Sequence, residues 1–124
     1  MQRTVLIADD NEDLREVLTY QLHLEGYRVL GAADGAEAIE KARSEKPDII
    51  LLDVLMTGMD GAEAGMRLKL DPQTSKIPVI FLTSLVLGGE VALTALGKDD
   101  VILPKSTELT VLLAKIREIL THTK

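Results

Sequence analysis

The sequence predicts an α/β fold in which a parallel β-sheet lies between helices on both of its faces. Short, solid apolar runs alternate with longer segments whose apolar residues have helical spacing, and this alternation repeats along the chain. Such a pattern is typical of parallel sheets whose crossover connections are right-handed. The length of 124 residues fits one domain, spanning 1–124, with a mainly aliphatic core.

Each expected strand is a short apolar run without alternating polar residues. Runs of this kind suit strands that are buried on both faces, as in the interior of a parallel sheet. We place the strands near residues 4–8, 28–32, 48–52, 78–82 and 100–103.

The first two helices have recognisable starting residues. Asn11 is expected to be the N-cap of a helix with an apolar stripe of Leu14, Val17, Leu18 and Leu22. Asp34 and Glu37 have the spacing of a capping box, which satisfies backbone N–H groups at a helix start. The second helix therefore begins near Asp34.

The remaining helices are predicted from the spacing of apolar residues. One is expected near 61–70, with Met66 and Leu70 facing inward, and another near 87–97. The last helix has the clearest apolar stripe, which consists of Leu109, Leu112, Leu113, Ile116 and Leu120. Together these helices complete the alternation of strand and helix.

Composition excludes several classes of function. The chain has 20 acidic and 14 basic residues, a net charge of −6, and no basic stretch, which argues against direct nucleic-acid binding. It contains no Cys, so disulfide and thiol chemistry are excluded, which is compatible with the cytoplasmic location that we expect. No apolar segment approaches the roughly 20 residues of a membrane span.

Residues suited to phosphate and metal chemistry stand where four of the expected strands end. Asp9 and Asp10 follow the first strand, Asp53 the third, Thr83 the fourth and Lys105 the fifth, after one proline. The carboxyl ends of parallel strands line one edge of a sheet, and ligands bind in the crevice beyond that edge. These five side chains should therefore converge.

If these side chains lie together, they can bind a cation and handle a phosphoryl group, which none of them can do alone. Acidic residues at strand ends are often only turn or cap residues, and Thr83 and Lys105 also have ordinary structural roles. Three crowded carboxylates repel one another, however, and a divalent cation such as Mg²⁺ would remove that cost. Asp53 could then attack phosphorus as a nucleophile, while Lys105 and Thr83 stabilise phosphoryl oxygens.

The pattern of Asp9-Asp10, Asp53, Thr83-Ser84 and Lys105 resembles the receiver domain of two-component response regulators. The segment after the third acid supports the resemblance, because D-V-L-M-T-G-M-D-G, residues 53–61, is similar to the family's D-x-x-M-P-x-M-D-G. The resemblance covers the whole chain. It implies a flavodoxin-like (βα)5 three-layer sandwich with strand order 2-1-3-4-5.

The resemblance also implies the roles of the site residues. Asp53 would be the phosphoacceptor, with a histidine kinase or phosphotransfer protein as donor. Mg²⁺ would be bound directly by Asp10, Asp53 and the Leu55 carbonyl, and through water by Asp9. Thr83 and Lys105 would contact the phosphoryl group.

Three positions differ from the family pattern. Thr57 and Ser106 stand where the family usually has proline, and a cis Lys105–Ser106 bond would cost about 3 kcal/mol without it. Ile102 replaces the family's switch aromatic, so a rotating ring cannot act together with Thr83 and Ser84 in the switch.

We expect a non-enzymatic receiver domain that signals to a protein partner, an output domain or a second copy of the chain. The apolar stretch 85–96 is the expected contact surface. An Asp-nucleophile phosphohydrolase is one alternative, although Leu55 stands where those enzymes carry a second acid and the chain lacks room for a cap domain. A receiver fold that serves as an interaction module without phosphorylation is the other.

Overall fold

The computed structural model describes residues 2–54, 56, 59, 61–83 and 100–122. Five parallel strands form one sheet in the order β2-β1-β3-β4-β5, which confirms the predicted fold class and strand order. The strands are β1 Thr4–Ala8, β2 Arg28–Ala32, β3 Ile49–Asp53, β4 Val79–Thr83 and β5 Val101–Pro104.

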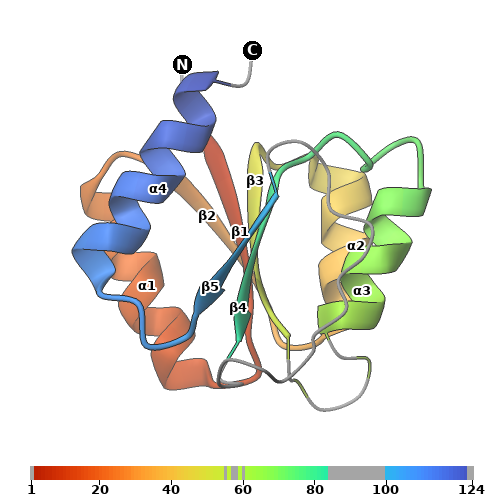
Figure 1. Ribbon diagram of the computed structural model, residues 1–124, viewed down its shortest axis with the longest axis horizontal. Coiled ribbons are helices and arrows are strands. Elements are labelled where there is room, and N and C mark those ends of the chain that lie inside the picture. The colour runs from red at the N-terminus through yellow and green to blue at the C-terminus, as the bar shows by residue number, and fades with distance from the viewer. Residues whose placement is uncertain (1, 55, 57–58, 60, 84–99, 123–124) are drawn as a thin grey trace.

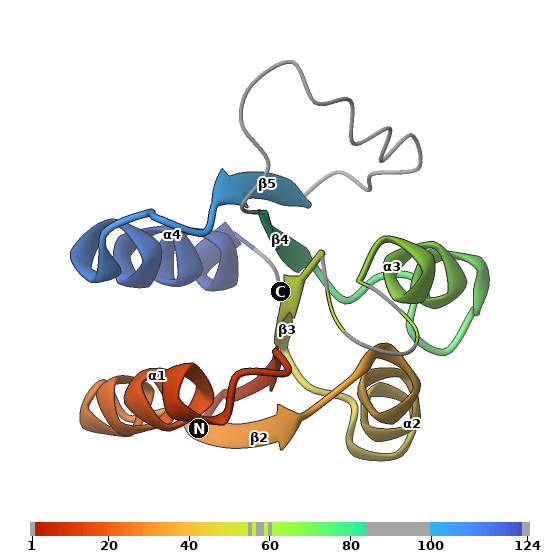
Figure 2. The same ribbon diagram turned by 90° about the horizontal axis from the view of Figure 1, so that it is seen from below.

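Helices cover both faces of the sheet, so that the domain has three layers. α1 and α4 lie on one face, and α2 and α3 lie on the other (Figures 1 and 2). Their bounds are α1 Glu12–Leu24, α2 Gly35–Glu45, α3 Gly61–Leu70 and α4 Leu109–His122. The helix expected near 87–97 lies outside the described residues. No helix in the described part of the chain is both long and apolar enough to cross a membrane.

Alternate residues of the central strands supply two apolar clusters, one on each face of the sheet. Leu6 of β1 belongs to the cluster that contains Leu68 of α3. Its neighbour Ile7 belongs to the cluster that contains Leu22 of α1 and Ile116 of α4. Every residue of β1, β3 and β4 is buried, which holds the strand ends in fixed positions.

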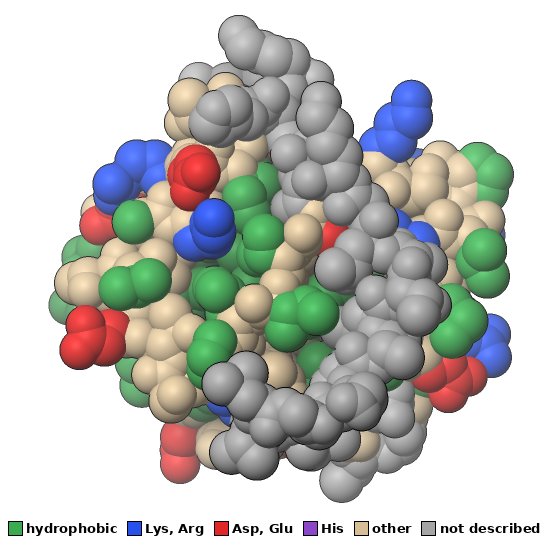
Figure 3. Space-filling model, in the orientation of Figure 1, with side chains coloured by type: hydrophobic (Ala, Val, Ile, Leu, Met, Phe, Trp, Pro, Cys, Tyr) green, Lys and Arg blue, Asp and Glu red, His purple; other side chains and the backbone are tan. Residues whose placement is uncertain are grey.

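The two edge strands are less buried than the sequence predicts. The expectation that all five runs are covered on both faces is wrong for β2 and β5, because each lies at an edge of the sheet. Ile102 on β5 is 39% exposed, and Figure 3 shows hydrophobic side chains at the surface where Figure 1 draws this strand. Pro104 is compatible with β5 because an edge strand has only one ladder to satisfy.

Both predicted helix caps are present. The Asn11 side chain accepts a hydrogen bond from the Leu14 N–H at 3.1 Å. The Asp34 side chain accepts one from the Glu37 N–H at 2.8 Å, and the Glu37 carboxylate accepts one from the Ala33 N–H at 2.8 Å. The capping box therefore extends one residue further upstream than its usual form, in which the glutamate binds the N-cap N–H.

The prediction for the inward face of α3 is wrong. Met66 and Leu70 are 55% and 75% exposed, while Leu68 and Gly65 are buried. A β-carbon at Gly65 would lie 2.4 Å from the Phe81 ring, so only glycine leaves room for that ring. Beside Leu68, the helix faces the sheet with small residues where Phe81 fills the space, and small residues give little apolar signal in a sequence.

Candidate functional site

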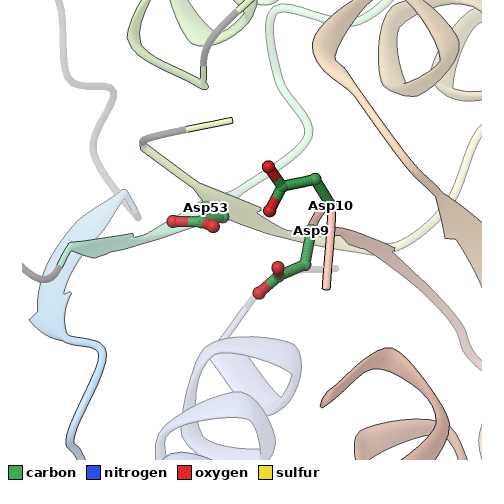
Figure 4. Close-up of side chains that lie close together, drawn as sticks. All are labelled: Asp9, Asp10 and Asp53. Carbon is green, nitrogen blue, oxygen red and sulfur yellow. The ribbon is translucent and has the colours of Figure 1, made fainter. Parts of the chain in front are cut away.

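The three predicted acids meet at the carboxyl ends of two neighbouring strands. β1 and β3 pair directly, with Ala8 opposite Leu52, so Asp9 and Asp53 follow at the same level of the sheet. One carboxylate oxygen from each of Asp9, Asp10 and Asp53 lies within 4.8 Å of the others (Figure 4). Asp9 and Asp53 are each 2% exposed, whereas Asp10 is exposed.

Asp9 is held on several sides. Its N–H donates to the Ala32 carbonyl at 3.0 Å, which continues the ladder between β1 and β2. Its Oδ1 accepts a hydrogen bond from the Asn11 N–H at 2.9 Å. The Arg15 guanidinium donates to its backbone carbonyl. These contacts fix the start of the loop that carries Asp10.

Lys105 supplies a positive charge to the acids. Its Nζ lies 2.8 Å from Asp53 Oδ2 and 3.3 Å from Asp9 Oδ2, and its side chain is 28% exposed. Burial alone would lower the pKa of the Lys105 ammonium, but the hydrogen bonds to Asp53 and Asp9 and their charges outweigh burial and raise it. Lys105 is therefore protonated at neutral pH.

Thr83 and Lys105 are linked through the backbone. The Lys105 N–H donates to the Thr83 carbonyl at 2.6 Å, just past the end of the β4–β5 ladder. Thr83 is buried at the end of β4, which lies next to the strand of Asp53. A displacement of Lys105 would therefore act directly on Thr83.

Gly61 allows α3 to begin directly against the end of β3. Its N–H donates to the Val54 carbonyl at 2.8 Å, and a β-carbon at this position would lie 1.9 Å from the Asp53 carbonyl oxygen. Any larger residue would push this helix start away from Asp53. The glycine of the D-x-x-M-P-x-M-D-G pattern thus has a steric reason in this chain.

The structure describes only some of the remaining positions that the sequence singles out. Leu55, Thr57 and Ser84 lie outside the described residues. Ile102 lies in β5 opposite Phe81 of β4 and is partly exposed at the surface. The described peptide bonds are all trans, including Lys105–Ser106, so the cis bond usual in the family is not present in this structure.

The donor set of the acid cluster fits a divalent cation. Asp9, Asp10 and Asp53 offer only carboxylate oxygens, which are the ligands that Mg²⁺ prefers. Against three carboxylates, Lys105 provides one ammonium group within the cluster. The cluster therefore has an excess of negative charge that a bound cation would neutralise.

Sequence reasoning missed Arg15. Its contact with Asp9 follows from helix geometry, because side chains on a helix lean toward the N-terminus and Arg15 stands in the second turn of α1. A single arginine on a helix that also carries acids gives no signal by itself. The strand end that it contacts must be known first.

Known proteins resemble this chain throughout its length. The family model described as 'Response regulator receiver domain' matches residues 5–117 of the sequence. The alkaline phosphatase synthesis transcriptional regulatory protein PhoP of Bacillus subtilis is 40% identical over 106 residues, which are 81% of this chain and 41% of PhoP. The response regulator MprA of Mycobacterium ulcerans is 38% identical over 125 residues, which cover 100% of this chain and 53% of MprA. The chain thus spans about half the length of these relatives.

Solved structures have the same fold. The signal receiver domain of a signal transduction histidine kinase from Syntrophus aciditrophicus superposes with a TM-score of 0.89 at 31% identity, covering 98% of this chain and 92% of that chain. The BeF3-activated receiver domain of RstA from Klebsiella pneumoniae superposes with a TM-score of 0.82 at 28% identity, covering 95% and 98%. The strand order, the acid cluster and these similarities agree: the chain belongs to the receiver domain family of two-component response regulators.

Proposed function

We propose that this receiver domain accepts a phosphoryl group on Asp53 from a histidine kinase or phosphotransfer protein. The observation that carries the proposal is the environment of the Asp53 carboxylate. It is buried at the end of a central strand, 2.8 Å from the Lys105 ammonium and within 4.8 Å of carboxylate oxygens of Asp9 and Asp10. This carboxylate is therefore held in place, shielded from water, and close to both an ammonium group and two further carboxylates.

In the proposed reaction, a carboxylate oxygen of Asp53 forms a bond to phosphorus, and the bond from phosphorus to the donor's imidazole nitrogen breaks. The electron pair of that bond leaves with the imidazole, which takes up a proton. Bound Mg²⁺ would neutralise charge on the phosphoryl oxygens. Asp10, Asp53 and the Leu55 carbonyl would hold the ion directly, and Asp9 through water.

Lys105 and Thr83 have roles on the other side of the transferred group. The Lys105 ammonium moves from its ion pair with Asp53 to a phosphoryl oxygen, and the Thr83 hydroxyl donates to another. The hydrogen bond from the Lys105 N–H to the Thr83 carbonyl supports this proposal, since it couples the two residues. β5, which carries the partly exposed Ile102, then responds as a unit.

The output of the domain is a conformational change and not a catalysed reaction. Ile102 is β-branched and stiff at χ1, so we expect the backbone around Thr83 and Ser84 to move while this side chain keeps one rotamer. The change is read by a protein partner, an output domain or a second copy of the chain. Spectra that report on the backbone and on the Ile102 side chain, recorded with and without a beryllofluoride mimic, would test which of the two moves.

Chemical phosphorylation tests the acceptor directly. Acetyl phosphate with Mg²⁺ should add one phosphoryl mass to the native chain and none to Asp53→Asn, which keeps the size of the side chain but loses the nucleophile. Asp13→Asn is the matched control, because Asp13 is exposed in the first turn of α1, outside the acid cluster, and should label like the native chain.

Three other outcomes would direct the assignment elsewhere. Equal labelling of the native chain and Asp53→Asn would refute Asp53 as the acceptor. A folded native chain that takes no label would favour the interaction module. Steady turnover of a generic phosphomonoester would instead favour the phosphohydrolase.

A further inference from the structure

Arg15 reaches from α1 to the backbone of the acid cluster. Its guanidinium donates a hydrogen bond to the carbonyl oxygen of Asp9. That carbonyl belongs to the peptide group that joins Asp9 to Asp10, the two adjacent acids of the cluster. Arg15 is thus connected to both acids without contacting either carboxylate in a described hydrogen bond.

The contacted peptide group determines where Asp10 begins. A peptide unit is planar, so fixing its carbonyl oxygen also fixes the direction of the N–H and Cα that follow it. Asp9 itself is anchored by its own N–H and by its Oδ1, and the Asp10 that follows it is exposed. The orientation of this peptide therefore sets the position from which the Asp10 side chain extends toward the cluster.

β2 leaves space for the arginine. A β-carbon at Gly31 would lie 3.8 Å from Cδ and Nε of Arg15, so the arginine stem lies directly over the glycine. Glycine in a strand costs stability, and it often marks a close approach by another group. Here the neighbouring group is the Arg15 side chain, which a β-carbon would meet at an ordinary contact distance.

We propose that Arg15 is a positioning residue that sets the orientation of the Asp9–Asp10 peptide and thereby the affinity of the acid cluster for Mg²⁺. The inference rests on the proposed function only in taking Mg²⁺ as the ligand of the cluster. Residues that orient metal ligands typically change metal affinity by about 10- to 100-fold when they are replaced.

The sign of the effect separates positioning from simple electrostatics. Arg15→Met keeps most of the stem but removes a positive charge near three carboxylates. If only charge mattered, this variant would bind Mg²⁺ more tightly than the native chain. Positioning predicts the opposite, a loss of roughly 10-fold in affinity.

The experiment is a Mg²⁺ titration of the full chain. The melting temperature and calorimetry both report how tightly Mg²⁺ binds. Arg67→Met is the charge-matched control, because Arg67 is exposed on α3 and pairs with Glu63 away from the cluster. It should bind Mg²⁺ like the native chain. Arg15→Lys keeps the charge on a shorter, differently shaped donor and should restore part of the affinity.

A second pair of variants tests the same contact without changing any charge. Gly31→Ala adds a β-carbon at an ordinary contact distance and should leave the arginine in place. Gly31→Val adds the same β-carbon and, beyond it, two methyl groups beside the arginine stem, while valine itself favours strands. Valine should therefore weaken Mg²⁺ binding without lowering the stability of the metal-free domain, and alanine should not weaken it.

The outcomes are separable. Native Mg²⁺ affinity, or tighter binding, in Arg15→Met would overturn the inference while leaving the proposed function intact. If that variant fails to fold, native affinity in Gly31→Val would overturn it equally. If the native chain itself shows no response to Mg²⁺, both the metal part of the proposed function and this inference fail.

Discussion

The two ends of the parallel strands, here called the amino edge and the carboxyl edge, use charge in opposite ways. At the amino edge, where the strands begin, Lys69 of α3 pairs with Asp100 before β5 at 3.0 Å, and their side chains are 10% and 1% exposed. Lys69 also donates to the carbonyls of Ser75 and Ile77, and Asp100 accepts from the Val79 N–H at 2.8 Å. One positive charge meets one negative charge, and both are further satisfied by backbone groups.

At the carboxyl edge, the charges do not balance. In the described part of the chain, carboxylates of Asp9, Asp10 and Asp53 lie together, and the Lys105 ammonium pairs with those of Asp53 and Asp9. A matched buried pair needs no further ligand, and replacing one partner would leave an uncompensated charge. An excess of carboxylates gains from a cation. We therefore expect the amino edge to serve stability and propose that the carboxyl edge binds a cation.

Breaking the balanced pair should have the largest effect on stability. Lys69→Met leaves the Asp100 carboxylate buried without its ammonium, and we expect a loss of about 3–5 kcal/mol in the free energy of unfolding. Urea denaturation would measure it. The exposed pair of Arg28 and Glu45 provides a control, since Arg28→Met should cost only about 0–1 kcal/mol. Equal losses in the free energy of unfolding for the two substitutions would show that the pair of Lys69 and Asp100 does not stabilise the fold more than an exposed pair does.

Relieving the unbalanced cluster should have a smaller effect of the opposite sign. Asp10→Asn removes one carboxylate that lies within 4.8 Å of two others, and the metal-free domain should gain about 1 kcal/mol. Unfolding in the presence of a chelator would measure the gain. Asp13→Asn should change stability less. A loss of stability in Asp10→Asn would contradict the idea that the acids repel one another.

Replacing Glu37 should have the smallest effect on stability, and this effect should depend on pH. The hydrogen bond from the Ala33 N–H, followed by that from Lys41, lowers the pKa of Glu37. The ionised side chain therefore stabilises the fold above its unfolded pKa, and this contribution is lost as pH falls through the lowered folded-state pKa. Because the pair with Lys41 is exposed, Glu37→Gln should cost only about 0.3–0.5 kcal/mol near neutral pH.

The measurement is a pair of unfolding curves at neutral pH and near pH 3. The difference between the native chain and Glu37→Gln should shrink at the lower pH, since glutamine already lacks the charge. A difference that grows on acidification would contradict the direction of the pKa shift.

The sequence was sufficient for the features that follow from local pattern and from fold rules. Solid apolar runs marked the strands, and parallel strands place Asp9, Asp53 and Lys105 at one edge whatever their separation in sequence. The caps at Asn11 and Asp34 were visible because capping depends on residues a few positions apart.

Features that depend on shape across the sheet were not visible. The spacing of apolar residues predicts Met66 and Leu70 on the inward face of α3, although the Phe81 ring requires Gly65 there. The pair of Lys69 and Asp100 joins residues from different elements, and neither stands in a recognisable pattern. Arg15 could be recognised only after the ends of β1 and β2 were placed.

A Mg²⁺ titration of the native chain and Asp10→Asn, followed by the melting temperature, tests the central claim most directly. A ligand that binds only the folded state stabilises it by about 2.7 kcal/mol at a hundred times its dissociation constant. The account predicts a rise in the melting temperature of the native chain with Mg²⁺, its loss on adding a chelator, and a much weaker rise in Asp10→Asn. A variant that responds to Mg²⁺ as fully as the native chain would contradict the assignment of the carboxyl edge to cation binding.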